Sequence, residues 1–126
     1  MAALCIASAS GIAKIAVTAF TLSWTHSVEK TRWEEDWRVT PAGLEIIEAR
    51  VEGSGAGMDP PDGSRFDGKF WRWKPPLKPL PELALRRSDA VPQGWTFCAE
   101  GRCRPIADAA EKADIVRLSP CLEQAK

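Results

Sequence analysis

The ionisable side chains that could carry chemistry near neutral pH are concentrated in one short stretch, residues 24–37. It contains His26, the only histidine of the 126-residue chain, and histidine is the side chain whose ordinary pKa lies closest to physiological pH. Three of the six tryptophans lie in the same stretch. We therefore take it as the candidate binding surface. The candidate binding residues are His26, Ser27, Glu29, Lys30, Glu34 and Glu35.

Two interpretations fit a histidine that is followed by glutamates. A carboxylate within reach of His26, such as that of Glu35, would raise the proton affinity of the imidazole and orient its ring, as an acid–base pair in a small hydrolase or lyase requires. The simpler interpretation is a hydrogen-bonded structural histidine at the edge of an aromatic core, because no nucleophile motif, phosphate-binding loop or metal-ligand array is present. We assign no catalytic residue and predict no cofactor and no metal.

An antiparallel hairpin would hold these residues. Residues 20–27 and 32–39 both alternate apolar with polar side chains, which is the period of half-buried strands. If residues 28–31 form the loop, His26 and Glu35 become diagonal neighbours on one face, within side-chain reach. The predicted cross-strand pairs are His26 with Trp33, Trp24 with Glu35, and Leu22 with Trp37.

The other face of the predicted hairpin carries only polar and charged side chains, and it is most simply a solvated face. Glu34 and Asp36 lie on it and could bind a cation or a basic partner. Two carboxylates without further oxygen ligands are too few for a calcium site.

The rest of the chain alternates between short strands and turns. Residues 44–51 fit either a strand or a short helix, and the turn before them and the glycines after them favour the strand. Only residues 106–113 resemble a helix, since they follow a proline and are rich in alanine. This pattern predicts an all-β fold with one minor helix, an antiparallel β-sandwich or small barrel, in a single domain over residues 1–126. Further strands are predicted at 4–8, 12–17, 69–73, 83–87, 95–98, 102–105 and 115–118.

Two segments interrupt the strand pattern. Residues 53–57, Gly-Ser-Gly-Ala-Gly, lack the final spacing of a dinucleotide-binding fingerprint, and they indicate a strand end that needs close backbone approach or positive φ. Residues 74–81 are rich in proline. They match a bare polyproline-recognition pattern, but a rigid loop crossing the end of a sandwich is the favoured interpretation.

The four cysteines suggest two disulfides. Cys98 and Cys103 would lie opposite each other across a tight hairpin with residues 100–101 at its tip, close enough for a bridge. Cys5 and Cys121 could form a second pair, although spacing does not fix the connectivity. One local pair with two remote cysteines disfavours a zinc site.

Composition and charge limit the possible partners and locations. Seventeen Lys plus Arg balance seventeen Asp plus Glu, so no strong field would attract nucleic acid or an anionic membrane. The charge-free residues 1–13 are too few to span a bilayer, which takes about 20 residues. They also lack a basic region before them, as a signal peptide would have, and this indicates the cytoplasm, whereas two disulfides would indicate an extracytoplasmic compartment.

Three blocks of the sequence carry a family resemblance. Residues 25–31, Thr-His-Ser-Val-Glu-Lys-Thr, the glutamates at 34 and 35, and residues 53–58, Gly-Ser-Gly-Ala-Gly-Met, together resemble the bacterial domain-of-unknown-function family 1850. The resemblance extends to residues 4–8 and 83–87. Members of that family recur beside the permeases of TAXI-class TRAP transporters. The resemblance implies a small accessory protein on the outer face of the cytoplasmic membrane, and it assigns neither a ligand nor an activity.

We therefore expect an accessory or binding module linked to a TAXI-class TRAP transporter. Its partner would be the permease or the substrate-binding subunit, and substitution of Glu29 or Lys30 should impair that interaction more than folding. A small hydrolase or lyase using His26 with Glu35 is the first alternative. A structural interaction domain is the second.

Overall fold

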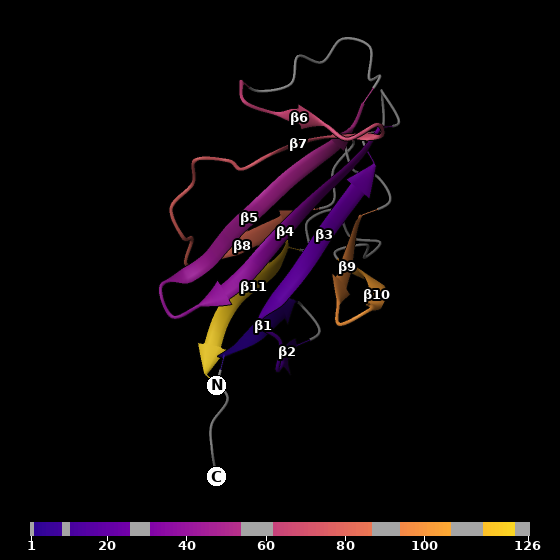
Figure 1. The fold of residues 1–126 in the computed structure, drawn as a ribbon. Helices are drawn as coiled ribbons and strands as arrows, with labels where there is room; N and C mark the ends of the chain where they lie inside the picture. The colour runs from indigo at the N-terminus through magenta and orange to yellow at the C-terminus, as the bar shows by residue number, and fades with distance from the viewer. Residues whose placement is uncertain are drawn as a thin grey trace.

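A computed structural model of the chain is built from strands that form two antiparallel sheets (Figure 1). It describes residues 2–8, 11–25, 31–53, 62–86, 94–106 and 115–122. Within these ranges the strands are β1 (Ala2–Ser8), β2 (Gly11–Ile15), β3 (Ala19–Thr25), β4 (Arg32–Thr40), β5 (Gly43–Glu52), β6 (Arg65–Phe66), β7 (Phe70–Trp73), β8 (Leu83–Arg86), β9 (Trp95–Ala99), β10 (Arg102–Ile106) and β11 (Ile115–Leu122).

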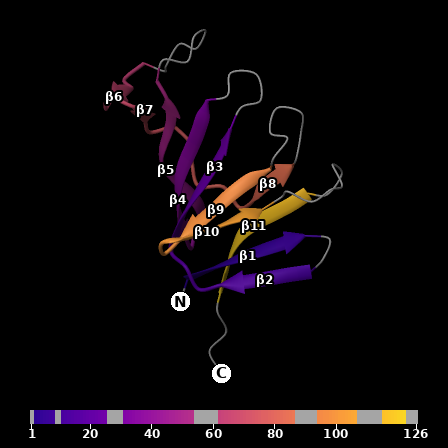
Figure 2. The ribbon, with the colours of Figure 1, turned by 90° about the vertical axis from the view of Figure 1, so that its right-hand side faces the viewer.

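The smaller sheet has the strand order β2-β1-β11-β8, and the larger has the order β10-β9-β3-β4-β5-β7-β6. The sheets pack on each other as a sandwich, and Figure 2 shows the β1–β2 hairpin below the ends of β9 and β10. The predicted all-β antiparallel sandwich is confirmed. We call the faces that the two sheets turn toward each other inner, and the opposite faces outer.

Most strands lie close to their predicted bounds, although β11 continues four residues beyond the predicted end at Leu118. There are two further differences. The short β6 was not predicted, because its two residues lie within a stretch rich in glycine and proline. Of the helix predicted at residues 106–113, Ile106 is instead the last residue of β10, and residues 107–113 lie outside the described ranges. The described residues contain no helix, so none of them forms a helix long and apolar enough to cross a membrane.

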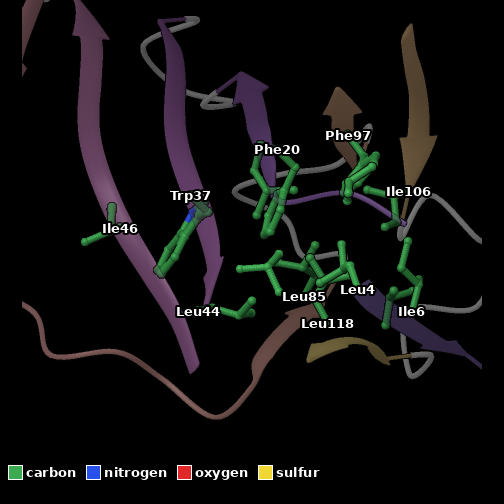
Figure 3. Close-up of a cluster of buried hydrophobic side chains, with 14 of the residues drawn as sticks. Leu4, Ile6, Phe20, Trp37, Leu44, Ile46, Leu85, Phe97, Ile106 and Leu118 are labelled. Atoms are coloured by element: carbon green, nitrogen blue, oxygen red, sulfur yellow. The ribbon is translucent and has the colours of Figure 1, made fainter. Parts of the chain in front are cut away.

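The core lies between the inner faces (Figure 3). Alternate residues of each strand reach it, as the period of two requires. Full burial of a large apolar side chain contributes about 1.5 to 3 kcal/mol, so this layer is the main source of stability. The larger sheet contributes Phe20, Leu22, Trp37, Leu44, Ile46 and Phe97, and the smaller sheet contributes Leu4, Ile6, Leu85, Val116 and Leu118.

The central hairpin forms as consecutive antiparallel strands, but its predicted register is wrong by two residues. Leu22 lies opposite Glu35, and the paired part ends at Thr25 and Arg32, so six residues separate the strands rather than four. This register places Trp24 directly opposite Trp33, with near-parallel rings 6.0 Å apart. Cross-strand aromatic pairs stabilise a sheet, which explains the choice of register. A shift of two leaves every side chain on its predicted face.

A β-bulge interrupts the pairing of β4 with β5. Asp36 pairs with Glu48 whereas Trp37 pairs with Ile46, so Ile47 is the extra residue. The bulge exchanges the two faces of β5: Ile46 faces the core before it and Ala49 after it. This exchange breaks the period of two, and it explains why residues 44–51 fitted a helix as well as a strand.

The proline-rich segment runs past one edge of the larger sheet on its way to β8 (Figure 1). Leu80 forms an isolated antiparallel bridge with Leu44, with N–H to O=C distances of 2.6 and 2.9 Å. Gly43 permits this approach, since a Cβ atom at its position would lie 2.5 Å from the carbonyl oxygen of Leu80. The segment therefore connects the two sheets rather than projecting as a recognition motif.

Two disulfides join strands within the sheets, and they include all four cysteines of the chain. Cys5 on β1 is bonded to Cys121 on β11, with Cα atoms 5.8 Å apart. Cys98 and Cys103 are directly opposite each other on β9 and β10, with Cα atoms 4.0 Å apart. The turn between β9 and β10 consists of two residues that both have positive φ, Glu100 and Gly101, as a type I′ hairpin requires.

Candidate functional site

The structure places the candidate glutamates on opposite faces of β4. Glu35 lies on the inner face and Glu34 on the outer face, as the alternation of a strand requires. The other four candidates, His26, Ser27, Glu29 and Lys30, lie outside the described residues. The predicted acid–base geometry depended on a register in which Glu35 faced Trp24. Since Glu35 faces Leu22, that support for a hydrolase or lyase is lost.

Glu35 is a carboxyl group in mainly apolar surroundings. Its strand partners are the buried side chains of Leu22 and Ala49. Burial raises the pKa of the Glu35 carboxyl, and a hydrogen bond from Trp37, whose Nε1 lies 3.1 Å from Oε1, only partly opposes this. No cation pairs with Glu35 among the described residues. Such a carboxyl can donate or accept a proton, or receive a ligand donor.

A row of tryptophans lies on the same inner face, next to Glu35. Trp24 contacts Trp95 at 4.5 Å between ring centroids and Trp33 at 6.0 Å, and Trp33 contacts Trp73 edge-on at 6.3 Å. We call Trp95, Trp24, Trp33 and Trp73 the tryptophan row. It crosses the end of the larger sheet at which β3 ends and β4 begins. Indole rings provide large apolar faces together with one N–H donor each.

Three buried polar atoms at this end have no hydrogen-bond partner. In the described ranges, the buried side-chain atoms without one are Thr31 Oγ1, Trp33 Nε1 and Trp95 Nε1. Thr31 precedes β4 directly, and both tryptophans belong to the tryptophan row. An unpartnered buried donor costs about 1 to 3 kcal/mol, and most buried polar groups in proteins are paired. Their location at one end of one sheet therefore marks that end as a candidate binding site.

The strand ends beside this site are joined to one another. The backbone N–H of Arg32 donates to Glu52 Oε1 at 2.8 Å, which connects the start of β4 with the end of β5. Gly53 follows directly, and a Cβ at its position would collide with the ring of Phe66, so this glycine does permit a close approach. Residues 26–30 and 54–61 adjoin these strand ends in the sequence and lie outside the described residues.

The outer face of the larger sheet is covered by a network of ion pairs rather than by separately solvated charges. Arg50 is its centre, with a side chain that is 13% exposed. Its Nε lies 2.6 Å from Glu34, and its two terminal nitrogens lie 2.8 and 3.2 Å from the two carboxylate oxygens of Asp36. One of them also lies 3.1 Å from Glu48, which in turn accepts a hydrogen bond from Arg72 at 2.6 Å. Glu34 and Asp36 are therefore already paired with arginine.

Electrostatics in the network favour the ionised carboxylates. Burial alone would raise the pKa values of Glu34 and Asp36. Hydrogen bonds from Arg32 and Arg50 to Glu34, and from Arg50 and Thr21 to Asp36, outweigh burial, so both pKa values lie below their ordinary range. No group of three or more His, Cys, Asp or Glu side chains in the described part of the chain is arranged to hold a metal ion.

Comparison with models of known protein families assigns the chain to a family. The model of a family described as "Domain of unknown function (DUF1850)" matches residues 20–106, which is more than half of the chain. The chain belongs to this family. Neither the curated proteins nor the solved structures contain a match.

The part that matches the DUF1850 family contains most of the site. Residues 20–106 include Glu35, the tryptophan row, the ion pairs around Arg50 and the Cys98–Cys103 disulfide. The Cys5–Cys121 disulfide lies outside the matched range. Sequence reasoning missed Arg50 and Thr31, since one lies on a strand whose partners were not known and the other was assigned to a loop.

Replacing Glu35 with glutamine should stabilise the protein in neutral solution. Because the pKa of Glu35 is raised in the folded state, wild-type stability falls as the pH rises from the ordinary carboxyl range through the raised pKa. Glutamine keeps the acceptor for Trp37 and carries no charge. We expect the melting temperature of Glu35→Gln to exceed that of wild type at pH 7 and to approach it at pH 3 to 4, measured by circular dichroism.

Glu45→Gln is the matched control, since Glu45 forms a 3.6 Å ion pair with Arg38 on the outer face. It should not raise the melting temperature at pH 7. Equal melting temperatures of wild type and Glu35→Gln at pH 7 would contradict the uncompensated burial of this carboxyl.

Proposed function

We propose that this member of the DUF1850 family is a non-catalytic binding module of the cell envelope that serves a TAXI-class TRAP transporter. It uses the end of the larger sheet marked by the tryptophan row to contact its partner. The partner is the transporter's permease or substrate-binding subunit.

The observation that carries the proposal is the group of unpartnered donors at this end. Thr31 Oγ1 and the N–H groups of Trp33 and Trp95 are buried without a hydrogen-bond partner. Glu35 lies two residues from Trp33 on the same face of β4, and no cation of the described residues pairs with it. Such groups suit a site that binds a partner, because hydrogen bonds to the partner would recover the cost of their burial. Tryptophans supply the apolar contact area that dominates binding energy at interfaces.

The location in the envelope is supported by the two disulfides. Disulfides persist in oxidising compartments and are rare in the cytoplasm, where thiols are kept reduced. All four cysteines of the chain are in disulfides. This supports folding on the outer side of the cytoplasmic membrane.

The link to a TAXI-class transporter is drawn from the sequence blocks at residues 25–31 and 53–58. Each block adjoins a strand end at the proposed contact site, since β3 ends at Thr25 and β5 ends at Glu52. Two of the three blocks that carry the resemblance thus adjoin the same end of the sheet as the unpartnered donors.

The test is co-purification from bacterial membranes. The chain, carrying an affinity tag and exported to the periplasm, is produced together with the permease and substrate-binding subunit of a TAXI-class transporter. We expect the permease or the substrate-binding subunit to co-purify with wild type. Trp33→Phe and Trp95→Phe should each reduce recovery about tenfold, because each loses a hydrogen bond of about 1.4 kcal/mol in the complex.

Trp71→Phe is the matched control, since Trp71 lies on β7 and its indole nitrogen is not among the buried unpartnered atoms. It should leave recovery unchanged, and melting temperatures should show that all three variants fold. The proposal fails if wild type recovers neither subunit, or if Trp71→Phe reduces recovery as much as Trp33→Phe.

A further inference from the structure

A second candidate site lies away from the tryptophan row, beside the turn between β9 and β10. A groove of about 700 Å³ opens there between the end of β2 and the β9–β10 hairpin. Figure 2 shows β2 and β10 near each other in this region. Both are edge strands of their sheets. The apolar residues of the groove are Ile15, Val17, Phe97 and Ala99.

Two arginines form the cationic part of the groove. Arg102 pairs with Ala99 and Arg104 pairs with Phe97, so both arginines extend from the inner face of the larger sheet. An inner face normally carries apolar side chains, because it covers the core. The arginines are two residues apart on one strand, which places their backbone positions about 6 to 7 Å apart along the same face.

Neither arginine has an anionic partner among the described residues. Within the described ranges, no ion pair joins Arg102 or Arg104 to a carboxylate, although Glu100 also lines the groove. The guanidinium of Arg104 lies over the ring of Phe97, with Cζ 5.8 Å from the ring centroid. This contact places one cation along the apolar side of the groove, and a cation over a ring face keeps its N–H donors at the edge of the guanidinium plane.

We propose that this groove binds an amphipathic small-molecule carboxylate. The carboxylate is held by Arg102 and Arg104, whose planar guanidinium groups match its geometry, and the hydrocarbon part lies against Ile15, Val17, Phe97 and Ala99. A volume of about 700 Å³ lies within the range of small-molecule sites, about 300 to 1,000 Å³. The inference is independent of the transporter proposal, because the groove involves neither the tryptophan row nor Glu35.

The experiment titrates the purified full chain, with no transporter subunit present, with 4-phenylbutyrate in a calorimeter. Two probes separate the contributions: 4-phenylbutanol has the hydrocarbon part without the charge, and acetate has the charge alone. We expect saturable binding of 4-phenylbutyrate with one site, and affinities at least tenfold weaker for both other probes. Binding should weaken in high salt, because ions screen exposed charges.

Variants locate the site. Arg102→Gln and Arg104→Gln should each weaken 4-phenylbutyrate binding about tenfold, and the double variant should abolish it. Ala99→Leu, which fills the groove, should weaken 4-phenylbutyrate binding and leave acetate binding unchanged. Arg38→Gln is the matched control, because Arg38 is an exposed arginine of the same sheet on the outer face. It should bind as wild type does.

Three outcomes would overturn the inference. They are the absence of saturable 4-phenylbutyrate binding, equal affinities for the acid and the alcohol, and an equal loss of affinity in Arg38→Gln and Arg102→Gln. Melting temperatures of all variants confirm that they fold. A failure here leaves the co-purification result unaffected, and a failure of co-purification leaves this titration unaffected.

Discussion

Replacement of both Cys5 and Cys121 by alanine should lower the free energy of unfolding by roughly 5 kcal/mol, as the chain-entropy model gives for a closed loop of this length. The bridge joins residues separated by 116 positions, so it restricts almost the whole unfolded chain. Urea unfolding followed by tryptophan fluorescence measures the change. A loss of this size is comparable with the entire stability of many small domains, so the variant should be largely unfolded at 37 °C.

The double replacement of Cys98 and Cys103 is the matched control. This bridge closes a loop of only five positions, for which the same model gives roughly 2 kcal/mol. Without reduction, alkylation should label no cysteine in wild type or in either double variant. After reduction, it should label two cysteines in each double variant. Equal losses of stability for the two pairs would contradict the prediction that the stabilisation by each disulfide depends on the length of the loop it closes.

Arg50→Met should have the next largest effect, a loss of about 3 kcal/mol in the free energy of unfolding, near the lower limit for breaking a buried ion pair. The substitution leaves Glu34, Asp36 and Glu48 close together without their shared cation. Lysine at position 50 should recover only part of the loss, because it cannot form the two-point contact with Asp36. Arg38→Met, which removes an ion pair with a 59% exposed arginine, should change stability by at most about 0.5 kcal/mol.

Lowering the pH should reduce the free energy of unfolding of wild type through the same carboxylates. Since the folded-state pKa values of Glu34 and Asp36 are lowered, their stabilisation is complete above the ordinary carboxyl range and is lost as the pH falls through the lowered values. Unfolding free energies measured between pH 7 and pH 2 should therefore fall steeply for wild type and less for Arg50→Met. Parallel curves would show that Arg50 does not account for the lowered pKa values.

The sequence predicted the strands well because their signal is local. Alternation marked residues 20–27 and 32–39 as strands and assigned Glu34 and Glu35 to opposite faces, and the turn at residues 100–101 placed Cys98 opposite Cys103. The same local signal supports neighbouring registers equally well when they differ by two residues, since every face is unchanged. The stacking of two tryptophans decided between them, and this is a contact between strands rather than a pattern within one.

The network around Arg50 and the groove beside Arg102 could not be predicted for a related reason. Arg50 meets Glu34 and Asp36 only because β5 pairs with β4 in the register that the bulge at Ile47 sets, and Glu48 lies two residues away on the same face of β5. In the sequence, Arg102 and Arg104 have the spacing of the polar residues that alternate along an exposed strand. Only the position of β10 at the edge of the larger sheet, beside the end of β2, gives them an apolar groove.

The bond between Cys5 and Cys121 also determines how the protein carries a mechanical load. β1 and β11 are antiparallel neighbours near the two ends of the chain, and the disulfide connects them covalently. A pulling force applied at the two ends would pass from Cys5 directly to Cys121, and the residues between them, including both proposed sites, would bear no tension. The protein should therefore keep its binding surfaces intact while it is stretched, until the disulfide is reduced.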